Sequence, residues 1–170
     1  MQVRGDPPRR MPIMLDEALL LGIASIAVAV AGFTAVTAAL TPPGGTWSAS
    51  HRVRQRAIVS TSFNVVLESL APIIVFAWLA DIRETMVVTS VAATLYLAVV
   101  VGTRGRQLAR AGAFRTWSGR LLFTPAVLAW LLFAANAFVL GSLALSAFAL
   151  CVQLSVSLIS FYQLVAAASA

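Results

Sequence analysis

The chain has 170 residues, of which 60% are hydrophobic and 11% are charged. A soluble domain carries about 25% charged residues, so this composition excludes an ordinary soluble enzyme, a disordered chain and a secreted disulfide-rich domain. All 12 basic residues are Arg, and the chain has one His and one Cys. The lack of Lys excludes a retinal Schiff base, and the single His and Cys exclude a multi-histidine metal site and an intrachain disulfide. We therefore expect an integral membrane protein that holds no cofactor and no metal.

Apolar runs define the expected spans, because a helix crosses the hydrocarbon core with about 20 apolar residues. The last run, 121–168, contains no charge. As one helix it would be about 72 Å long at 1.5 Å per residue, which is over twice the thickness of the hydrocarbon core. The run must therefore fold back, and the best break lies near Gly141. The sequence predicts an all-α bundle forming a single transmembrane domain over 1–170, with four spans as the alternative if one segment is re-entrant. The five expected spans are 18–40, 57–80, 85–102, 121–139 and 143–166.

Arginine placement predicts the orientation. The connections 41–56 and 103–120 hold eight of the 12 Arg residues, whereas the connection 81–84 is net acidic. Because Arg-rich connections stay in the cytoplasm, we expect the N-terminus outside and the C-terminus in the cytoplasm. The Ala-rich, all-Arg composition favours the inner membrane of a prokaryote. We expect these arginines to contact anionic lipids or a protein partner, and not nucleic acid: Arg52, Arg54, Arg56, Arg104, Arg106, Arg110, Arg115 and Arg120.

Glu68 is the strongest candidate functional residue. It is the twelfth residue of the 24-residue span 57–80, so it falls near the bilayer midplane, where a charged side chain costs at least about 2.5–3.5 kcal/mol. Ser60 and Asn64 precede it at intervals of four residues and share its helical face, and Pro72 removes the hydrogen bond to its carbonyl. This stripe predicts a cation or proton path. The alternative is a protonated Glu68 that is hydrogen-bonded to a neighbouring helix.

The last expected span carries a second polar stripe. Five residues recur at spacings of 4, 7, 4 and 3 and so share one face: Ser142, Ser146, Gln153, Ser157 and Ser160. We take Gln153 and Ser157 as further candidates for the ion path. The alternative is interhelical packing, because small polar residues let helices approach closely and hydrogen bond across the contact.

Several short motifs follow one another along the chain. They are the segment Ala31-Gly-Phe-Thr-Ala-Val, the pair Trp47-Ser, the run Arg52-Val-Arg-Gln-Arg, the stretch Glu68-Ser-Leu-Ala-Pro72 and the terminal Ser160-Phe-Tyr-Gln. In this order the chain resembles, over most of residues 30–165, a group of small uncharacterised bacterial membrane proteins. The resemblance implies a multi-span topology and no particular activity.

Together these features predict a homo-oligomeric ion channel that conducts cations or protons. In such an assembly, Glu68 side chains around a symmetry axis would form a constriction. The alternative is a non-transporting membrane anchor or regulatory subunit that binds a protein partner through its Arg-rich cytoplasmic face. We do not expect an enzyme, because few acid, base or nucleophilic groups converge and no lipid-modifying motif is present.

Overall fold

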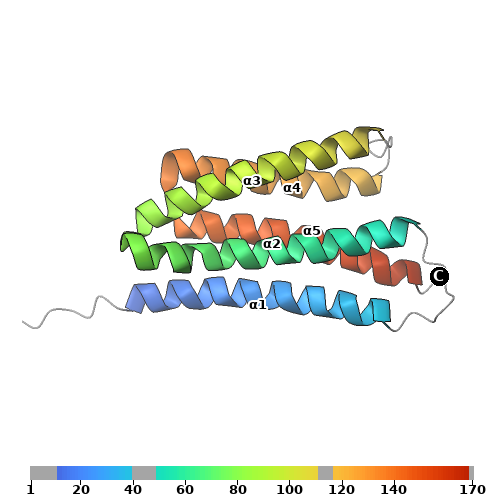
Figure 1. Ribbon diagram of the computed structural model, residues 1–170, viewed down its shortest axis with the longest axis horizontal. Helices are drawn as coiled ribbons and strands as arrows, with labels where there is room; N and C mark the ends of the chain where they lie inside the picture. Colours follow the sequence, from blue (N-terminus) through green and yellow to red (C-terminus); the bar gives the residue numbers. More distant parts are fainter. Residues whose placement is uncertain (1–10, 40–48, 111–116, 169–170) are drawn as a thin grey trace, which may run out of the picture.

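A computed structural model describes residues 11–39, 49–110 and 117–168, without the side chains of some residues near the helix ends. This described part forms antiparallel helices and contains no strand (Figure 1). The helices are α1 (Met11–Ala39), α2 (Ala49–Leu79), α3 (Ile82–Arg110), α4 (Trp117–Ala135) and α5 (Leu143–Ala168), and α4 continues into a π-helical turn, η2 (Asn136–Leu140). The described residues include five helical segments long and apolar enough to cross a membrane, the fourth of which runs from α4 into η2, and this confirms the expected all-α fold.

Helix α5 holds the bundle together, because it contacts each of the other four α-helices. Helix α2 packs mainly on α1 and α5, and α3 packs mainly on α4, with less extensive contacts to α2 and η2. Figure 1 shows α5 beside α2, with α1 below them and α3 and α4 above. The span of α5 is the most buried of the five, so polar residues on it are placed among helices.

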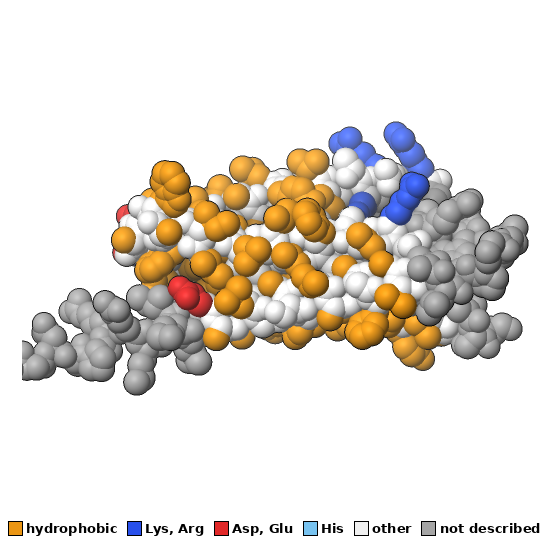
Figure 2. Space-filling view, turned by 60° about the horizontal axis from the view of Figure 1, so that its bottom comes forward, with side chains coloured by type: hydrophobic (Ala, Val, Ile, Leu, Met, Phe, Trp, Pro, Cys, Tyr) orange, Lys and Arg blue, Asp and Glu red, His pale blue; other side chains and the backbone are white. Residues whose placement is uncertain are grey.

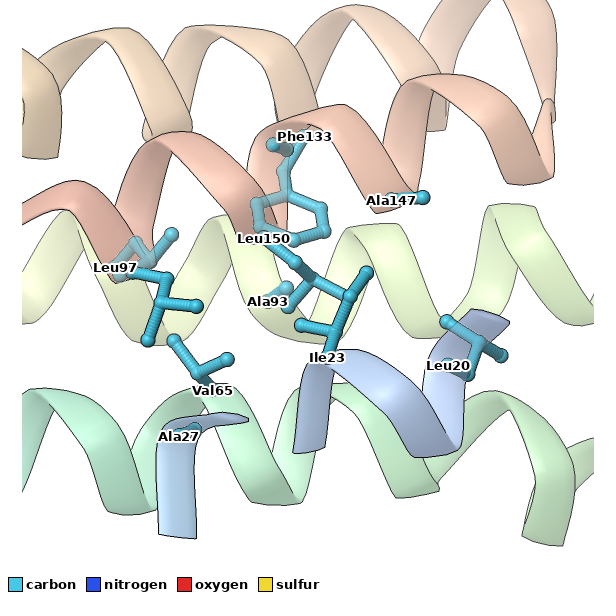
Figure 3. Packing of buried hydrophobic residues seen from close by; sticks show 11 residues of the cluster. Leu20, Ile23, Ala27, Val65, Ala93, Leu97, Phe133, Ala147 and Leu150 are labelled. Carbon is cyan, nitrogen blue, oxygen red and sulfur yellow. The ribbon is translucent and has the colours of Figure 1, made fainter. Parts of the chain in front are cut away.

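Apolar side chains fill the interior and also cover the outside. Figure 3 shows the interior cluster, in which Ile23 of α1 lies close to Leu150 of α5, and Leu20 of α1 belongs to the same cluster. Large apolar side chains such as Phe33 and Leu95 are more than half exposed on the outer surface, and Figure 2 shows such side chains spread along the length of the bundle. A helix that is apolar on all sides is typical of a membrane span.

Two tight turns separate consecutive helices. Between α2 and α3, Ala80 adopts a left-handed conformation with φ 54°, and Asp81 caps α3 by accepting a hydrogen bond from the Glu84 amide at 2.8 Å. Between η2 and α5, Gly141 is left-handed with φ 55° and its N–H donates to the Asn136 carbonyl. The fold-back therefore occurs at a residue that tolerates this conformation.

The helices extend further at the Arg-rich end of the bundle than the sequence predicted. The expected connection 41–56 is shortened because α2 begins at Ala49, and the expected connection 103–120 is shortened because α3 continues to Arg110 and α4 begins at Trp117. The physical reason is that Arg is a good helix former whose long side chain carries its charge away from the apolar surface.

Candidate functional site

The carboxyl group of Glu68 lies inside the bundle. Both of its oxygens are shielded from solvent, and neither has a hydrogen-bond partner among the described residues. The side chain of Gln153 on α5 approaches this carboxyl, yet the Gln153 carbonyl oxygen is also buried without a partner. Helix α2 places Glu68 four residues before Pro72, which itself is buried. The structure thus brings together two residues that the sequence assigned to separate stripes.

A pocket of about 400 Å³ opens beside Glu68, between α2 and α3. Helix α2 contacts α3 less extensively than it contacts α1 or α5. The walls of the pocket are mostly apolar, with Phe133 of α4 among them, and its polar side chains include Asn64, Thr89 and Tyr96. Glu68 therefore lies between the pocket on one side and helix α5 on the other.

The other two residues of the Glu68 stripe are paired with side chains of α3. The Tyr96 hydroxyl donates to Asn64 Oδ1 at 2.9 Å, and Arg104 Nη2 donates to Ser60 Oγ at 2.7 Å. Ser60 and Asn64 therefore face α3, and Asn64 and Glu68 both line the pocket. Glu68 differs from the other two, because its oxygens have no partner among the described residues.

Arg104 is less exposed than the other described arginines at the same end of the bundle. Its half-buried guanidinium lies between α3 and α2, where it also reaches the Thr61 hydroxyl at 3.4 Å. By contrast, Figure 2 shows arginine side chains standing out at this end, and those described as exposed are Arg56, Arg106, Arg110 and Arg120. The side chains of Arg52, Arg54 and Arg115 lie outside the described residues.

The second polar stripe points into the protein. Ser146, Gln153, Ser157 and Ser160 are each no more than 3% exposed. Near the start of α5, Ser146 belongs to a satisfied cluster in which Asn136 Nδ2 donates to Ser146 Oγ at 2.8 Å and to Ser90 Oγ at 2.9 Å. Further along α5, Ser157 Oγ and Gln153 Oε1 have no partner among the described residues. Near the start of α5, therefore, this stripe hydrogen bonds to other helices, whereas further along α5 two of its side chains have polar atoms without a partner among the described residues.

Sequence reasoning missed one residue of this site, Tyr96, and one buried polar residue elsewhere on α2, Ser62. Tyr96 was recognisable, because it is a polar aromatic residue in the middle of an expected span, whereas such residues usually lie at span ends. Ser62 is completely buried and its hydroxyl is without a partner among the described residues. It lies off the Ser60–Asn64–Glu68 face, so helical spacing gave no signal for it.

Within the described part of the chain, no group of three His, Cys, Asp or Glu side chains is placed to hold a metal ion. Comparisons with protein-family models, with curated proteins and with solved structures found no match. The chemistry of the site therefore rests on its geometry.

Proposed function

We propose that this chain is an integral protein of a prokaryotic inner membrane and that it conducts protons or cations along a path through Glu68. The five apolar helices and the apolar outer surface support the membrane location. Exposed arginine side chains gather at one end of the bundle and acidic side chains lie at the other (Figure 2). At this second end Asp81, Arg83 and Glu84 are exposed where α3 begins, and Glu17 lines a pocket with Ile82. This charge distribution supports an N-terminus outside and a C-terminus in the cytoplasm.

The unpartnered carboxyl of Glu68 is the observation that carries this proposal. A purely structural Glu in the middle of an apolar bundle is expected to hydrogen bond to a neighbouring helix. The side chain of Gln153 on α5 approaches the carboxyl as a hydrogen-bonding group, but no partner among the described residues meets the distance and angle of a hydrogen bond to either Glu68 oxygen. Ionisable residues at this depth are typical of ion paths and proton relays.

The proposed path runs inside one chain. Gln153 and Ser157 are 3% and 0% exposed in a single bundle, so they do not lie on a surface that a second copy would meet. Glu68 likewise has its oxygens shielded by its own chain. Assembly into a homo-oligomer stays a separate prediction, in which each copy would carry its own path.

The test is ion flux into sealed liposomes that contain the purified, folded protein. Glu68→Gln keeps the shape of the side chain and removes its ionisable group, and Glu84→Gln is the matched control, because Glu84 is exposed at the start of α3. We expect the wild type and Glu84→Gln to dissipate a proton or cation gradient and Glu68→Gln to fall to the leak of empty liposomes. Equal flux through Glu68→Gln, or no flux through the wild type under proton, sodium and potassium gradients, would contradict the proposal.

The exposed arginines favour a second candidate function, that of a membrane subunit docking an acidic protein partner at the Arg-rich end. Arg56, Arg106 and Arg110 stand at this end and are exposed. The discriminating experiment is copurification from the native membrane with the wild type and with an Arg106→Glu, Arg110→Glu variant. A partner retained by the wild type and lost by the variant would favour the subunit.

A further inference from the structure

Arg104 carries a charge that no acidic side chain in the described part of the chain neutralises. Its half-buried guanidinium donates to Ser60 Oγ at 2.7 Å and to Thr61 Oγ1 at 3.4 Å, and both acceptors are neutral hydroxyls. Among the described acidic side chains, Glu68 has no hydrogen-bond partner, and the others lie at the opposite end of the bundle. A guanidinium has five N–H donors, and a partly buried charge is stabilised by a paired anion. Arg104 therefore retains donors and charge for an anion from outside the chain.

The depth of Arg104 in a bilayer favours a lipid phosphate as this anion. The α3 span, Ile82–Gln107, has 26 residues and is about 39 Å long at 1.5 Å per residue. The hydrocarbon core is about 30 Å thick, and the bilayer with its headgroups is about 40–45 Å thick. Arg104 lies three residues before the end of this span, so it is about 15 Å from the midplane when the span is centred. This is the level at which acyl chains meet headgroups.

The surroundings of Arg104 favour a headgroup of net negative charge. Arg56 is exposed one helical turn before Ser60 on α2 and shares its face, and Arg106 is exposed on α3. Arg binds phosphate oxygens through two parallel N–H groups, and a serine hydroxyl can donate to a further oxygen. Basic clusters at a membrane surface attract anionic lipids, so the charges here complement an anionic phospholipid.

The pocket between α2 and α3 begins about one turn deeper in the same groove. Asn64, one turn beyond Ser60, is among its lining residues. The lining on α2 spans residues 63–72, which lie about 5–18 Å from the level of Ser60. One leaflet of the hydrocarbon core is about 15 Å deep. The pocket therefore covers the depth that the acyl chain of a lipid held at Arg104 would occupy.

The pocket opens on the outer surface, and its walls are mostly carbon. Phe63, Leu67 and Tyr96 line it and are 60%, 52% and 46% exposed, so its mouth faces the lipid of a membrane. The Tyr96 hydroxyl is bonded to Asn64, and the oxygens of Glu68 are shielded. Such walls suit a hydrocarbon chain and provide no partner for a small soluble anion.

We infer that this groove binds one anionic phospholipid, with the phosphate at Arg104, Ser60 and Thr61 and one acyl chain in the pocket between α2 and α3. The headgroup contact supplies the charge that Arg104 lacks, and the chain fills a space that the helices leave open. This inference rests on the membrane location in the proposed function and is independent of ion conduction.

The test is binding of phosphatidylglycerol to the purified protein in detergent, measured by native mass spectrometry, with circular dichroism to show that each variant is folded. Arg104→Gln removes the charge at the phosphate, and Arg106→Gln is the matched control, because Arg106 is exposed on the same helix. Ala92→Leu fills the pocket, and Ala98→Leu is its control, because both alanines are exposed on α3 but Ala98 is not among the lining residues. The alanine pair decides the test if Arg104→Gln does not fold.

We expect Arg104→Gln to raise the Kd for phosphatidylglycerol roughly tenfold, which corresponds to about 1.4 kcal/mol and to the loss of one charge-assisted hydrogen bond. Ala92→Leu should raise the Kd at least about threefold, because the leucine takes space and contacts from the acyl chain. Both controls should keep the wild-type Kd. Phosphatidylcholine with the same chains should bind the wild type more weakly, and inorganic phosphate should not displace phosphatidylglycerol.

Several outcomes would overturn the inference. They are an equal Kd for the two lipids, equal losses in Arg104→Gln and Arg106→Gln, an unchanged Kd in Ala92→Leu, and displacement of the lipid by inorganic phosphate. Binding in detergent involves no ion gradient, so its result is separate from that of the flux assay. Weak, unspecific lipid binding with intact flux would refute this inference alone, whereas specific lipid binding without flux would refute only the proposed conduction.

Discussion

Replacement of Asn136 by Ala should loosen the junction between the last two helices. Asn136 is fully buried in η2, and its Nδ2 donates to Ser90 on α3 and Ser146 on α5. Its Oδ1 accepts the backbone N–H of Ser142 at 2.7 Å, where the chain turns into α5. One side chain therefore ties three segments together.

The magnitude follows from these three hydrogen bonds. Interhelical hydrogen bonds in membrane proteins average about 0.6 kcal/mol each, and the bond that satisfies the backbone of the turn contributes about 1 kcal/mol. Ser90 and Ser146 retain a contact at 3.4 Å with each other after the substitution. We expect Asn136→Ala to lower the free energy of unfolding by about 2–3 kcal/mol, which includes the loss of packing around a fully buried side chain.

Equilibrium unfolding of the purified protein in mixed micelles, with SDS as the denaturant and helix content as the signal, measures this change. Asn64→Ala is the matched control, because Asn64 is partly exposed and makes one hydrogen bond, to Tyr96; we expect a loss of about 0.6 kcal/mol. A loss below about 1 kcal/mol for Asn136→Ala, or equal losses for the two variants, would refute the role assigned to the buried cluster.

Further predictions concern the two turns and are checked by the same unfolding assay. Gly141→Ala should destabilise the protein by at least about 1–2 kcal/mol, because φ is 55° and the new Cβ would lie 2.9 Å from Arg83 Cγ; no loss would contradict the left-handed turn. Ala80→Gly should stabilise it by about 1 kcal/mol, since Ala80 is left-handed, and a loss would contradict that conformation. Asp81→Ala should cost about 1 kcal/mol through the lost helix cap; an unchanged stability would show that the cap does not form.

Local chemistry allowed much of the helical framework to be predicted. Charge-free stretches longer than a bilayer require turns, and the turn at Gly141 occurs where a residue without Cβ accepts a positive φ. Helical spacing likewise predicted that Ser60, Asn64 and Glu68 share a face; Ser60 and Asn64 hydrogen bond to α3, and Asn64 and Glu68 line the pocket. The ends of α2 and α3 were less predictable, because Arg residues continue a helix past the apolar run.

The partners of these faces were decided only by tertiary packing. Spacing cannot show that Gln153 approaches Glu68, that Tyr96 bonds Asn64, or that Arg104 turns inward to Ser60 while Arg106 stays exposed. In a soluble protein, the apolar stripe of a helix identifies its buried side. Here large apolar side chains cover the outer surface as well as the interior, as is typical of membrane spans, so the sequence by itself indicated the number of helices and the position of Glu68 in the middle of the second apolar segment. The packing of α2, α3 and α5 decided which helix each polar face meets. This packing depends on how side chains far apart in the sequence fit together and hydrogen bond, which spacing along one helix does not show.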